Sequence, residues 1–415
     1  MMKPVLIIFL FLSVGGFLYM KLNEQETVKM IEVSHLSAQE AEHPRELSLP
    51  ISREQVERSC KPTDAGPDSK VILVTGAAGF VGFHSSLALH QRGDGVLGID
   101  NFNEYYPSTL KRDRQTQLQM AGVHVVDADL NDEAVLEEIF GICGFTHVLH
   151  LAAQAGVRYA VKNPGAYVHS NLAAFVTLFE VIRKRPDVGE VMPVVVYASS
   201  SSVYGLNTKV PFSEDDRVDR PASLYAATKK SNEMMAHTYN HIYGLSVTGL
   251  RFFTVYGPYG RPDMAYFSFA NNIMSGRPIK IFQGPGGIEL GRDFTFIDDI
   301  VRGCVSALDH AGPNGKGVAQ AKVYNLGNTH PVNVSDFVVI LEEHLGKEAK
   351  REYVPMPSTG DVLLTHADVS KAMSELEYKP TTSLTEGLGK FVAWYKEYYK
   401  GGAHPEQLNY KPARR

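Results

Sequence analysis

Short apolar runs and longer amphipathic stretches alternate along the chain from residue 70 onward. The apolar runs are rich in β-branched residues, so we expect strands at 71–75, 96–99, 123–126, 147–151 and 194–197. Between them apolar residues recur at helical spacing, for example over 84–91 and 134–140. Strands that alternate with helices of this length form βαβ units and a parallel sheet. Because the runs are apolar throughout, we expect helices on both faces of that sheet.

The alternation ends near residue 255, where Gly and Pro become frequent. Segments such as 257–258 and 284–287 divide the rest of the chain into shorter elements. This pattern predicts a second, smaller lobe that is interleaved with the last strands of the first. The predicted fold class is α/β, a Rossmann-type doubly wound parallel sheet over 70–255 with a smaller C-terminal substrate-binding lobe over 256–415.

The N-terminus has a different pattern. Residues 5–20 are apolar apart from one Ser and two Gly, whereas 23–69 are polar, Glu-rich and without periodicity. We expect 1–22 to be a membrane anchor or a signal segment and 23–69 to be a linker. The favoured arrangement is a single-pass anchor in the secretory pathway, in the Golgi, with a lumenal catalytic domain; a cleaved signal is the alternative. One lysine, Lys3 or Lys21, lies on each side of the run. The positive-inside rule therefore barely favours one orientation in the membrane over the other.

Charge and cysteine content exclude some function classes. A net charge of -5 gives no reason to expect nucleic acid as a partner. The three cysteines, Cys60, Cys143 and Cys304, are too few and too scattered for a zinc site or a disulfide framework. We expect unpaired thiols and no metal, and the redox compartment stays open.

A glycine-rich loop follows the first predicted strand and opens a helix, in VILVTGAAGFVG. Glycines in this context let the backbone approach a pyrophosphate, which the free N–H groups of the helix then bind. Asp100 follows the second strand, 21 residues after Gly79, where an acid accepts the ribose hydroxyls and disfavours a 2′-phosphate. The pattern therefore predicts NAD rather than NADP. The predicted cofactor contacts in these segments are Gly76, Gly79, Phe80, Val81, Gly82, Asp100, Asn101, Asp129 and Leu130.

Tyr225 and Lys229 lie four residues apart in a stretch with helical spacing, so they share one helix face. A Lys charge beside a phenol favours the phenolate, which takes a proton from a sugar hydroxyl while the cofactor takes the hydride. Four serines, Ser199 to Ser202, leave the fifth strand at the edge of the sheet where doubly wound folds bind ligands. Hydroxyls that cap backbone groups are the alternative reading for one or two of them.

These segments, in this order, resemble the extended short-chain dehydrogenases that act on nucleotide sugars. The resemblance covers about residues 70–395 and implies that Ser200, Tyr225 and Lys229 are the catalytic residues. It also implies a nicotinamide site at Ala152, Ala153 and Gln154, with Asn171 near the cofactor. A homodimer is expected from the resemblance alone.

Three longer segments, 151–159, 197–205 and 250–263, are similar to UDP-glucuronate 4-epimerases. A uronic acid needs donors for its carboxylate, and Arg261, Thr254, Ser201 and Ser202 supply them. The related decarboxylases carry a Glu immediately before Val-Tyr-Gly, where this chain has Ser202. By resemblance, Arg292 contacts phosphate and Asp361 the uridine ribose. Wall residues of the substrate site are expected at Arg158, Phe267 and Gln283, whereas Asp298 and Asp299 are expected as helix caps.

The predicted function is the reversible 4-epimerisation of UDP-glucuronate to UDP-galacturonate through a 4-keto intermediate, with tightly bound NAD. Decarboxylation to UDP-xylose and 4-epimerisation of neutral UDP-hexoses are the alternatives within the same fold. A non-catalytic NAD-binding scaffold is the alternative from another class.

Overall fold

The computed structural model describes residues 51–64, 66, 69–312, 319–357 and 360–400. The predicted anchor or signal segment at 1–22 and most of the predicted linker lie outside the described residues. From Ile51 onward the chain forms one compact unit. All elements below belong to this unit.

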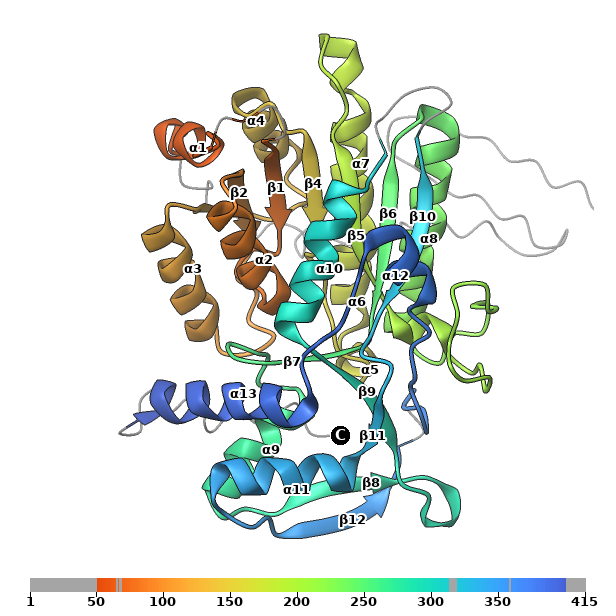
Figure 1. The fold of residues 1–415 in the computed structure, drawn as a ribbon. Coiled ribbons are helices and arrows are strands. Elements are labelled where there is room, and N and C mark those ends of the chain that lie inside the picture. The colour runs from red at the N-terminus through yellow and green to blue at the C-terminus, as the bar shows by residue number, and fades with distance from the viewer. Residues whose placement is uncertain (1–50, 65, 67–68, 313–318, 358–359, 401–415) are drawn as a thin grey trace, which may run out of the picture. The chain divides into compact units, whose positions relative to one another are not determined.

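A seven-stranded sheet with the order β10-β6-β5-β4-β1-β2-β3 forms the centre of the molecule (Figure 1). Every pair of neighbouring strands in it is parallel. The strands are β1 (Val71–Thr75), β2 (Gly95–Asp100), β3 (His124–Asp127), β4 (His147–His150), β5 (Val194–Ser200), β6 (Val247–Phe252) and β10 (Ala321–Leu326). The five strands predicted from the sequence are confirmed, and so is the Rossmann-type fold class.

Helices cover both faces of the sheet because alternate residues of each strand enter different apolar clusters. In β1, Ile72 and Val74 pack in one cluster and Leu73 packs in the other. The first cluster includes α2 (Phe80–Gln91), α3 (Thr109–Ala121), α10 (Ile297–Asp309) and α12 (Ser370–Leu376). The second includes α1 (Arg53–Ser59), α4 (Glu133–Ile142), α7 (Ala174–Arg183) and α8 (Leu224–Tyr243).

Smaller elements form the lower part of the molecule in Figure 1, below the carboxyl ends of the central strands. One small sheet holds β7 (Thr254–Tyr256), β9 (Gly291–Phe296) and β11 (Pro331–Asn333), and another pairs β8 (Ile279–Gln283) with β12 (Arg351–Pro355). They pack with α9 (Ala265–Met274), α11 (Val334–Leu345) and α13 (Leu384–Tyr398) around a third, aromatic-rich cluster. The remaining short helices are α5 (Tyr159–Lys162), α6 (Pro164–Tyr167), a π-helix η2 (Val168–Ala173), and the 3-10 turns η3 (Arg185–Val188), η4 (Ser201–Tyr204) and η5 (Pro285–Gly287).

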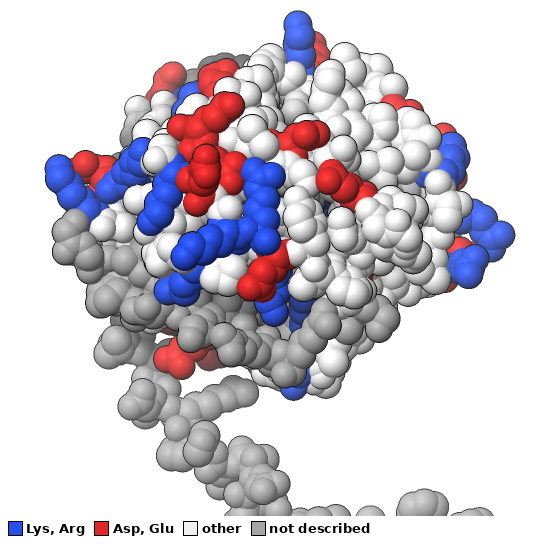
Figure 2. Space-filling view, turned by 90° about the horizontal axis from the view of Figure 1, so that it is seen from below, with Lys and Arg blue, Asp and Glu red and all other residues white. Residues whose placement is uncertain are grey.

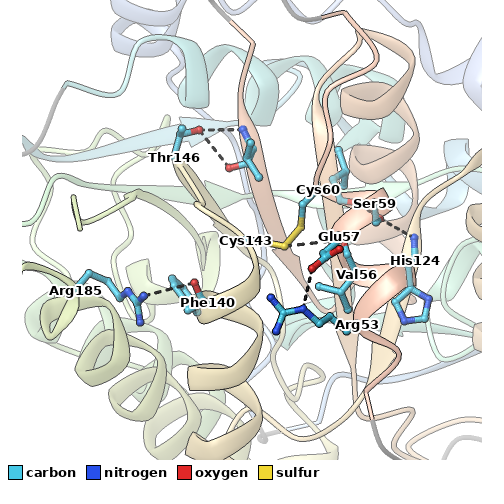
Figure 3. Close-up of a disulfide and its surroundings, with 12 residues drawn as sticks. Arg53, Val56, Glu57, Ser59, Cys60, His124, Phe140, Cys143, Thr146 and Arg185 are labelled. Carbon is cyan, nitrogen blue, oxygen red and sulfur yellow. Dashed lines mark hydrogen bonds and ion pairs between the residues drawn. A yellow bond between two sulfur atoms is a disulfide. The ribbon is translucent and has the colours of Figure 1, made fainter. Parts of the chain in front are cut away.

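A disulfide between Cys60 and Cys143 ties α1 to the end of α4 (Figure 3). The prediction of unpaired thiols is therefore wrong for these two residues, whereas Cys304 is free and buried. The linker prediction is also wrong from residue 51 on, since α1 is packed on the sheet: Val56 is fully buried, and Ser59 donates to the carbonyl of Val96. Within α1 itself Val56 and Ser59 are the buried residues, too few to give a helical period in the sequence.

The helical stretch 164–188 is apolar and long enough to cross a membrane by composition, the one such stretch among the described residues. Its inward side belongs to the second apolar cluster, where Phe175, Leu178 and Phe179 are buried. It therefore serves as a core helix of this unit. On the face seen from below, basic and acidic side chains lie beside one another (Figure 2).

Candidate active site

A cavity of about 1630 Å³ lies between the carboxyl ends of the central strands and the smaller elements below them. Its volume exceeds the range typical of a site for one drug-sized ligand, so it has room for a dinucleotide and a second nucleotide together. One side is lined by the loops that follow β1, β2, β4 and β5. The other is lined by residues from β7, β9, α9 and β12.

The glycine-rich loop fits a pyrophosphate. Gly76 has a φ of +68°, and a Cβ there would lie 2.8 Å from the backbone of Ala152. A Cβ at Gly82 would lie 2.1 Å from the carbonyl oxygen of Gly76. Gly79 is the N-cap of α2 and provides no side-chain cap, which leaves the first N–H groups of the helix for a ligand.

Acidic side chains line the adjoining part of the cavity, where an adenosine would lie. Asp100 is buried and accepts hydrogen bonds from the backbone N–H groups of Ala78 and Phe102, at 3.1 and 2.8 Å. Asp129 accepts from Asn101, at 2.8 Å, and lies 3.0 Å from the ring of His169. Burial alone would raise the pKa of Asp129, but these hydrogen bonds lower it to about 2. Hydrogen bonds therefore fix both carboxylates along this part of the cavity.

Tyr225 and Lys229 lie on the first two turns of α8, whose N-terminus is capped by Ser223. The Lys229 ammonium is buried and donates to the carbonyl of Ala198, at 2.8 Å; burial lowers its pKa to about 8. Burial raises the pKa of Tyr225, while its hydrogen bond with Ser200 and the charge of Arg261 act in the opposite direction. Both groups line the cavity with Ser200.

A buried ion pair next to the serine turn holds α8 in place. Arg251 donates to both carboxylate oxygens of Glu233, at 2.8 and 2.9 Å, and Glu233 accepts from Ser199, at 2.7 Å. Glu233 stands on the same face of α8 as Lys229. The pair therefore links α8 to β5 and β6, which fixes the position of the serine turn.

A second basic group approaches the same point from the loop after β7. Arg261 donates through Nε and Nη2 to the two carboxylate oxygens of Asp263, at 3.0 and 2.6 Å. Tyr105, from the loop after β2, donates to the same carboxylate at 3.0 Å. Thr254, at the start of β7, also lines the cavity, with Ser201 and Ser202.

The far end of the cavity holds a cluster of two arginines and an acid. Arg158 donates to Asp361, at 3.1 Å, and its guanidinium lies 4.6 Å from the ring centre of Phe282. Arg292 lies 4.0 Å from the same carboxylate. Burial lowers the pKa of Arg292, which remains a cation at neutral pH. Two cations beside one carboxylate are a suitable environment for a diphosphate and a ribose hydroxyl.

The cavity brings together most residues predicted from the sequence, with three exceptions. Phe267 is fully buried among aromatic side chains of α13, so its prediction as a wall residue is wrong. Gln283 is also outside the lining. Asn171 lies one layer behind it, where its side chain bonds the backbone N–H and C=O of Gln154.

Asp299 accepts from the backbone of Thr381 and Thr382, so it fixes a distant loop rather than capping its own helix.

Polar lining residues that were not predicted include Tyr105, Lys111 and Asp263. Lys111 lies 3.7 Å from Asp100, and both side chains are buried. Asp263 is the last residue of the segment 250–263, within Arg-Pro-Asp, and its place two residues after Arg261 was the available signal for it. The role of Tyr105 depends on a contact between residues 158 positions apart, which no local pattern reveals.

Comparisons with known proteins agree with this geometry. The model of the NAD dependent epimerase/dehydratase family matches residues 72–327. UDP-glucuronate 4-epimerase 3 of Arabidopsis thaliana is 61% identical over 337 residues, 80% of this chain and 77% of that protein. The crystal structure of UDP-glucuronic acid 4-epimerase from Bacillus cereus with UDP-glucuronic acid and NAD superimposes with a TM-score of 0.70, at 34% identity, over 79% of this chain and 99% of that one. A UDP-glucose 4-epimerase from Thermotoga maritima with UDP-glucose gives 0.68, at 30% identity, over 79% and 99%.

Proposed function

The chain belongs to the NAD-dependent epimerase/dehydratase family, and we propose that it interconverts UDP-glucuronate and UDP-galacturonate by inverting C4 of the uronic acid. One observation carries the proposal. Hydroxyl donors and an arginine, from Ser201, Ser202, Thr254 and Arg261, line the same cavity as Tyr225 and Lys229. This set offers a carboxylate-binding surface beside a catalytic base.

Tyr225 takes the proton of the 4-hydroxyl and returns it, with Ser200 bonded to its phenol oxygen. Gly76, Gly79 and Gly82 would hold the pyrophosphate of NAD, which would supply the acceptor for the C4 hydride and its source for the return. Lys229 holds a positive charge beneath the site, and Arg261 adds a second one that favours the phenolate. Arg158, Arg292 and Asp361 hold the UDP end while the 4-keto sugar turns over.

The side chain at position 202 supports epimerisation over decarboxylation. The 4-keto form of a uronic acid is a β-keto acid, which loses CO2 readily. Ser202 cannot act as a carboxylate acid or base there, and its backbone N–H is bonded to Ser200 at 3.1 Å. A site of this kind holds the carboxylate with neutral hydroxyls and one cation, which retains it until the ketone is reduced again.

The test is a product assay with UDP-glucuronate, in which the nucleotide sugars are separated and identified. We expect UDP-galacturonate without added NAD, because the cofactor is regenerated in each cycle. The Tyr225→Phe variant should lose turnover while still binding UDP. UDP-xylose as the main product would contradict the proposal, as would a Tyr225→Phe variant with near-normal rates.

We infer that the enzyme is a homodimer that pairs through α7 and α8. Large apolar side chains remain exposed on these helices and on the turn before them: Val168, Val176, Met234 and Ile242. Exposed apolar rows on neighbouring long helices favour a four-helix contact. Sedimentation analysis should give twice the monomer mass, and Met234→Glu should shift it to the monomer.

We infer that the catalytic unit resides on the lumenal side of the secretory pathway, in the Golgi, behind a single-pass N-terminal anchor. The apolar run at 5–20 supports an anchor, and the Cys60–Cys143 disulfide supports an oxidising compartment. Protease protection in intact vesicles tests the orientation.

A further inference from the structure

We propose that Asp263 and Tyr105 are positioning residues that set the selectivity for a uronic acid over a neutral hexose, by fixing the direction of the Arg261 guanidinium. The inference rests on the proposed uronate substrate. It assigns a role to two residues of the cavity that do not themselves supply the donors for the sugar carboxylate.

The first support is how Arg261 shares its hydrogen bonds. A guanidinium has five N–H donors in one plane. Among the described residues, its side-chain hydrogen bonds go to Asp263, through Nε and one N–H of Nη2. This two-point contact fixes the plane and leaves the opposite edge, Nη1 and the second N–H of Nη2, for another carboxylate. The side chain is 21% exposed, and it lines the cavity beside Tyr225.

The second support is that Asp263 is itself held in place. Its Oδ2 accepts from the hydroxyl of Tyr105 as well as from Arg261. The Tyr105 ring packs against Tyr159, with 4.8 Å between ring centres. Gly156 has a φ of +101°, and a Cβ there would lie 2.3 Å from the Tyr105 hydroxyl oxygen. The tyrosine therefore occupies space that only a glycine leaves open.

The third support is that the backbone before Arg261 is fixed from the cofactor side. The fully buried Arg114 donates to the carbonyls of Tyr259 and Gly260, at 2.6 and 3.3 Å. It also donates to Ala78 in the glycine-rich loop, at 2.8 Å. With the backbone fixed here, the direction of the guanidinium depends on its side-chain partner, Asp263.

Charge explains why a carboxylate is needed at this position. A partly buried arginine without a counter-ion would turn toward other acceptors or solvent, since an unpaired charge with little access to water is costly. Asp263 offsets this cost, so the guanidinium faces the sugar before the substrate arrives. A guanidinium that is already in position binds the uronate carboxylate without a loss of free energy for reorientation. A neutral hexose has no carboxylate at that carbon, so its binding does not improve.

The experiment measures ligand binding in the Tyr225→Phe background, where the substrate is not converted. Dissociation constants of UDP-glucuronate, UDP-glucose and UDP are compared by calorimetry for Asp263→Asn and Tyr105→Phe. Asp219→Asn is the matched control, because Arg217 and Asp219 form a pair of the same spacing on the exposed surface. In parallel, kcat and KM for UDP-glucuronate are measured with Tyr225 intact.

We expect Asp263→Asn to weaken UDP-glucuronate binding about tenfold or more, with KM raised in parallel, and to change UDP and UDP-glucose binding less than twofold. Tyr105→Phe should give a smaller change in the same direction, and Asp219→Asn no change. An equal loss for all three ligands would overturn the proposal in favour of a purely structural role. Tighter binding of UDP-glucuronate would overturn it too, since Asp263 would then compete with the substrate.

If the unmodified enzyme prefers UDP-glucuronate in binding but yields another product, the proposed reaction fails while this inference stands.

Discussion

Single residues decide whether the cofactor loop can form. Gly76 combines a left-handed φ of +68° with a close approach to the backbone of Ala152. For an L-residue with a Cβ, that conformation alone costs about 1–2 kcal/mol. The contact joins the loop after β1 to the loop after β4, the two segments that meet beneath the predicted nicotinamide site.

We therefore expect Gly76→Ala to purify with less bound NAD and with a lower melting temperature. The new methyl group must displace the backbone of Ala152, which cannot move without disturbing β4. Gly141→Ala is the control, since a Cβ at that helical position meets nothing within 4 Å. NAD released by acid, measured per mole of enzyme, gives the result. Equal NAD content in both variants would show that the loop tolerates the methyl group.

Burial of His150 makes the stability of the fold depend on pH. It is buried at the end of β4, its Nδ1 lies 2.8 Å from the hydroxyl oxygen of Thr75, and burial lowers its pKa to about 3, with the Lys229 charge acting in the same direction. The folded protein thus keeps this ring neutral, while the unfolded chain binds a proton near pH 6.5. Because the unfolded state binds more protons in this window, stability falls as the pH drops from about 6.5 toward 3.

The His150→Asn variant should lose this part of the pH dependence. One histidine contributes at most about 1.4 kcal/mol per pH unit to the slope. Urea unfolding at several pH values between 7 and 4 measures it in both proteins. The variant is expected to be less stable at pH 7, because a ring is removed from a packed site, but flatter toward low pH. Parallel curves for the two proteins would mean that the ring binds its proton at the same pH in the folded and the unfolded state, against the burial argument.

The residues that the sequence predicted from local motifs are the ones that the structure brings into the cavity. Gly76, Tyr225 and Lys229 sit in short motifs whose spacing is dictated by one turn or one helix. Phe267 was misjudged because an aromatic residue on α9 faces either the cavity or the core, and the choice depends on α13, more than 100 residues later. Tyr105 was missed for the same reason.

At the scale of elements, the Cys60–Cys143 bond and α1 form one unit at the amino ends of the central strands. A Cβ at Gly95, the first residue of β2, would lie 2.2 Å from the carbonyl oxygen of Cys60. The backbone N–H of His124, the first residue of β3, donates to Ser59 at 2.9 Å. In Figure 1, α1 lies at the opposite end of the sheet from α9 and β12. Its contribution should therefore be to stability rather than to turnover.

We expect the double variant Cys60→Ser, Cys143→Ser to unfold at a lower denaturant concentration but to keep its kcat at 25 °C. Native disulfides of this kind contribute about 2–4 kcal/mol, largely through the unfolded chain, and this one closes a loop with a sequence separation of 83. Cys304→Ala, at the free buried thiol, separates loss of the bond from loss of a cysteine. A reducing agent should reproduce the shift in the unmodified protein and in Cys304→Ala, but not in the double variant. If kcat fell with stability unchanged, the bond would have to act on the site.

At the scale of the whole molecule, the chain crosses between the central sheet and the smaller elements more than once. The smaller elements begin after β6, yet β10 returns to the edge of the central sheet beside β6, with Tyr324 and Leu326 buried in its core. The sequence predicted this interleaving only in outline, because an edge strand of six residues carries little periodic signal of its own. Long-range pairing across the sheet determines where such a strand goes.

The location of the whole molecule can be tested at Asn333, which begins an Asn-Val-Ser sequence at the start of α11. Asn333 is exposed, and the side chain makes no capping hydrogen bond at this helix start in the described structure. An Asn in this sequence and on the surface accepts an N-linked glycan only where the chain enters the secretory lumen. A lumenal catalytic unit should therefore carry a glycan there when it is expressed in its native cell type. Treatment with a glycosidase should increase gel mobility, and Asn333→Gln should migrate like the treated protein. The opposite result has two parts: the untreated protein already migrates like Asn333→Gln, and protease digests it in intact vesicles. Together they would place the catalytic unit on the cytosolic side despite its disulfide.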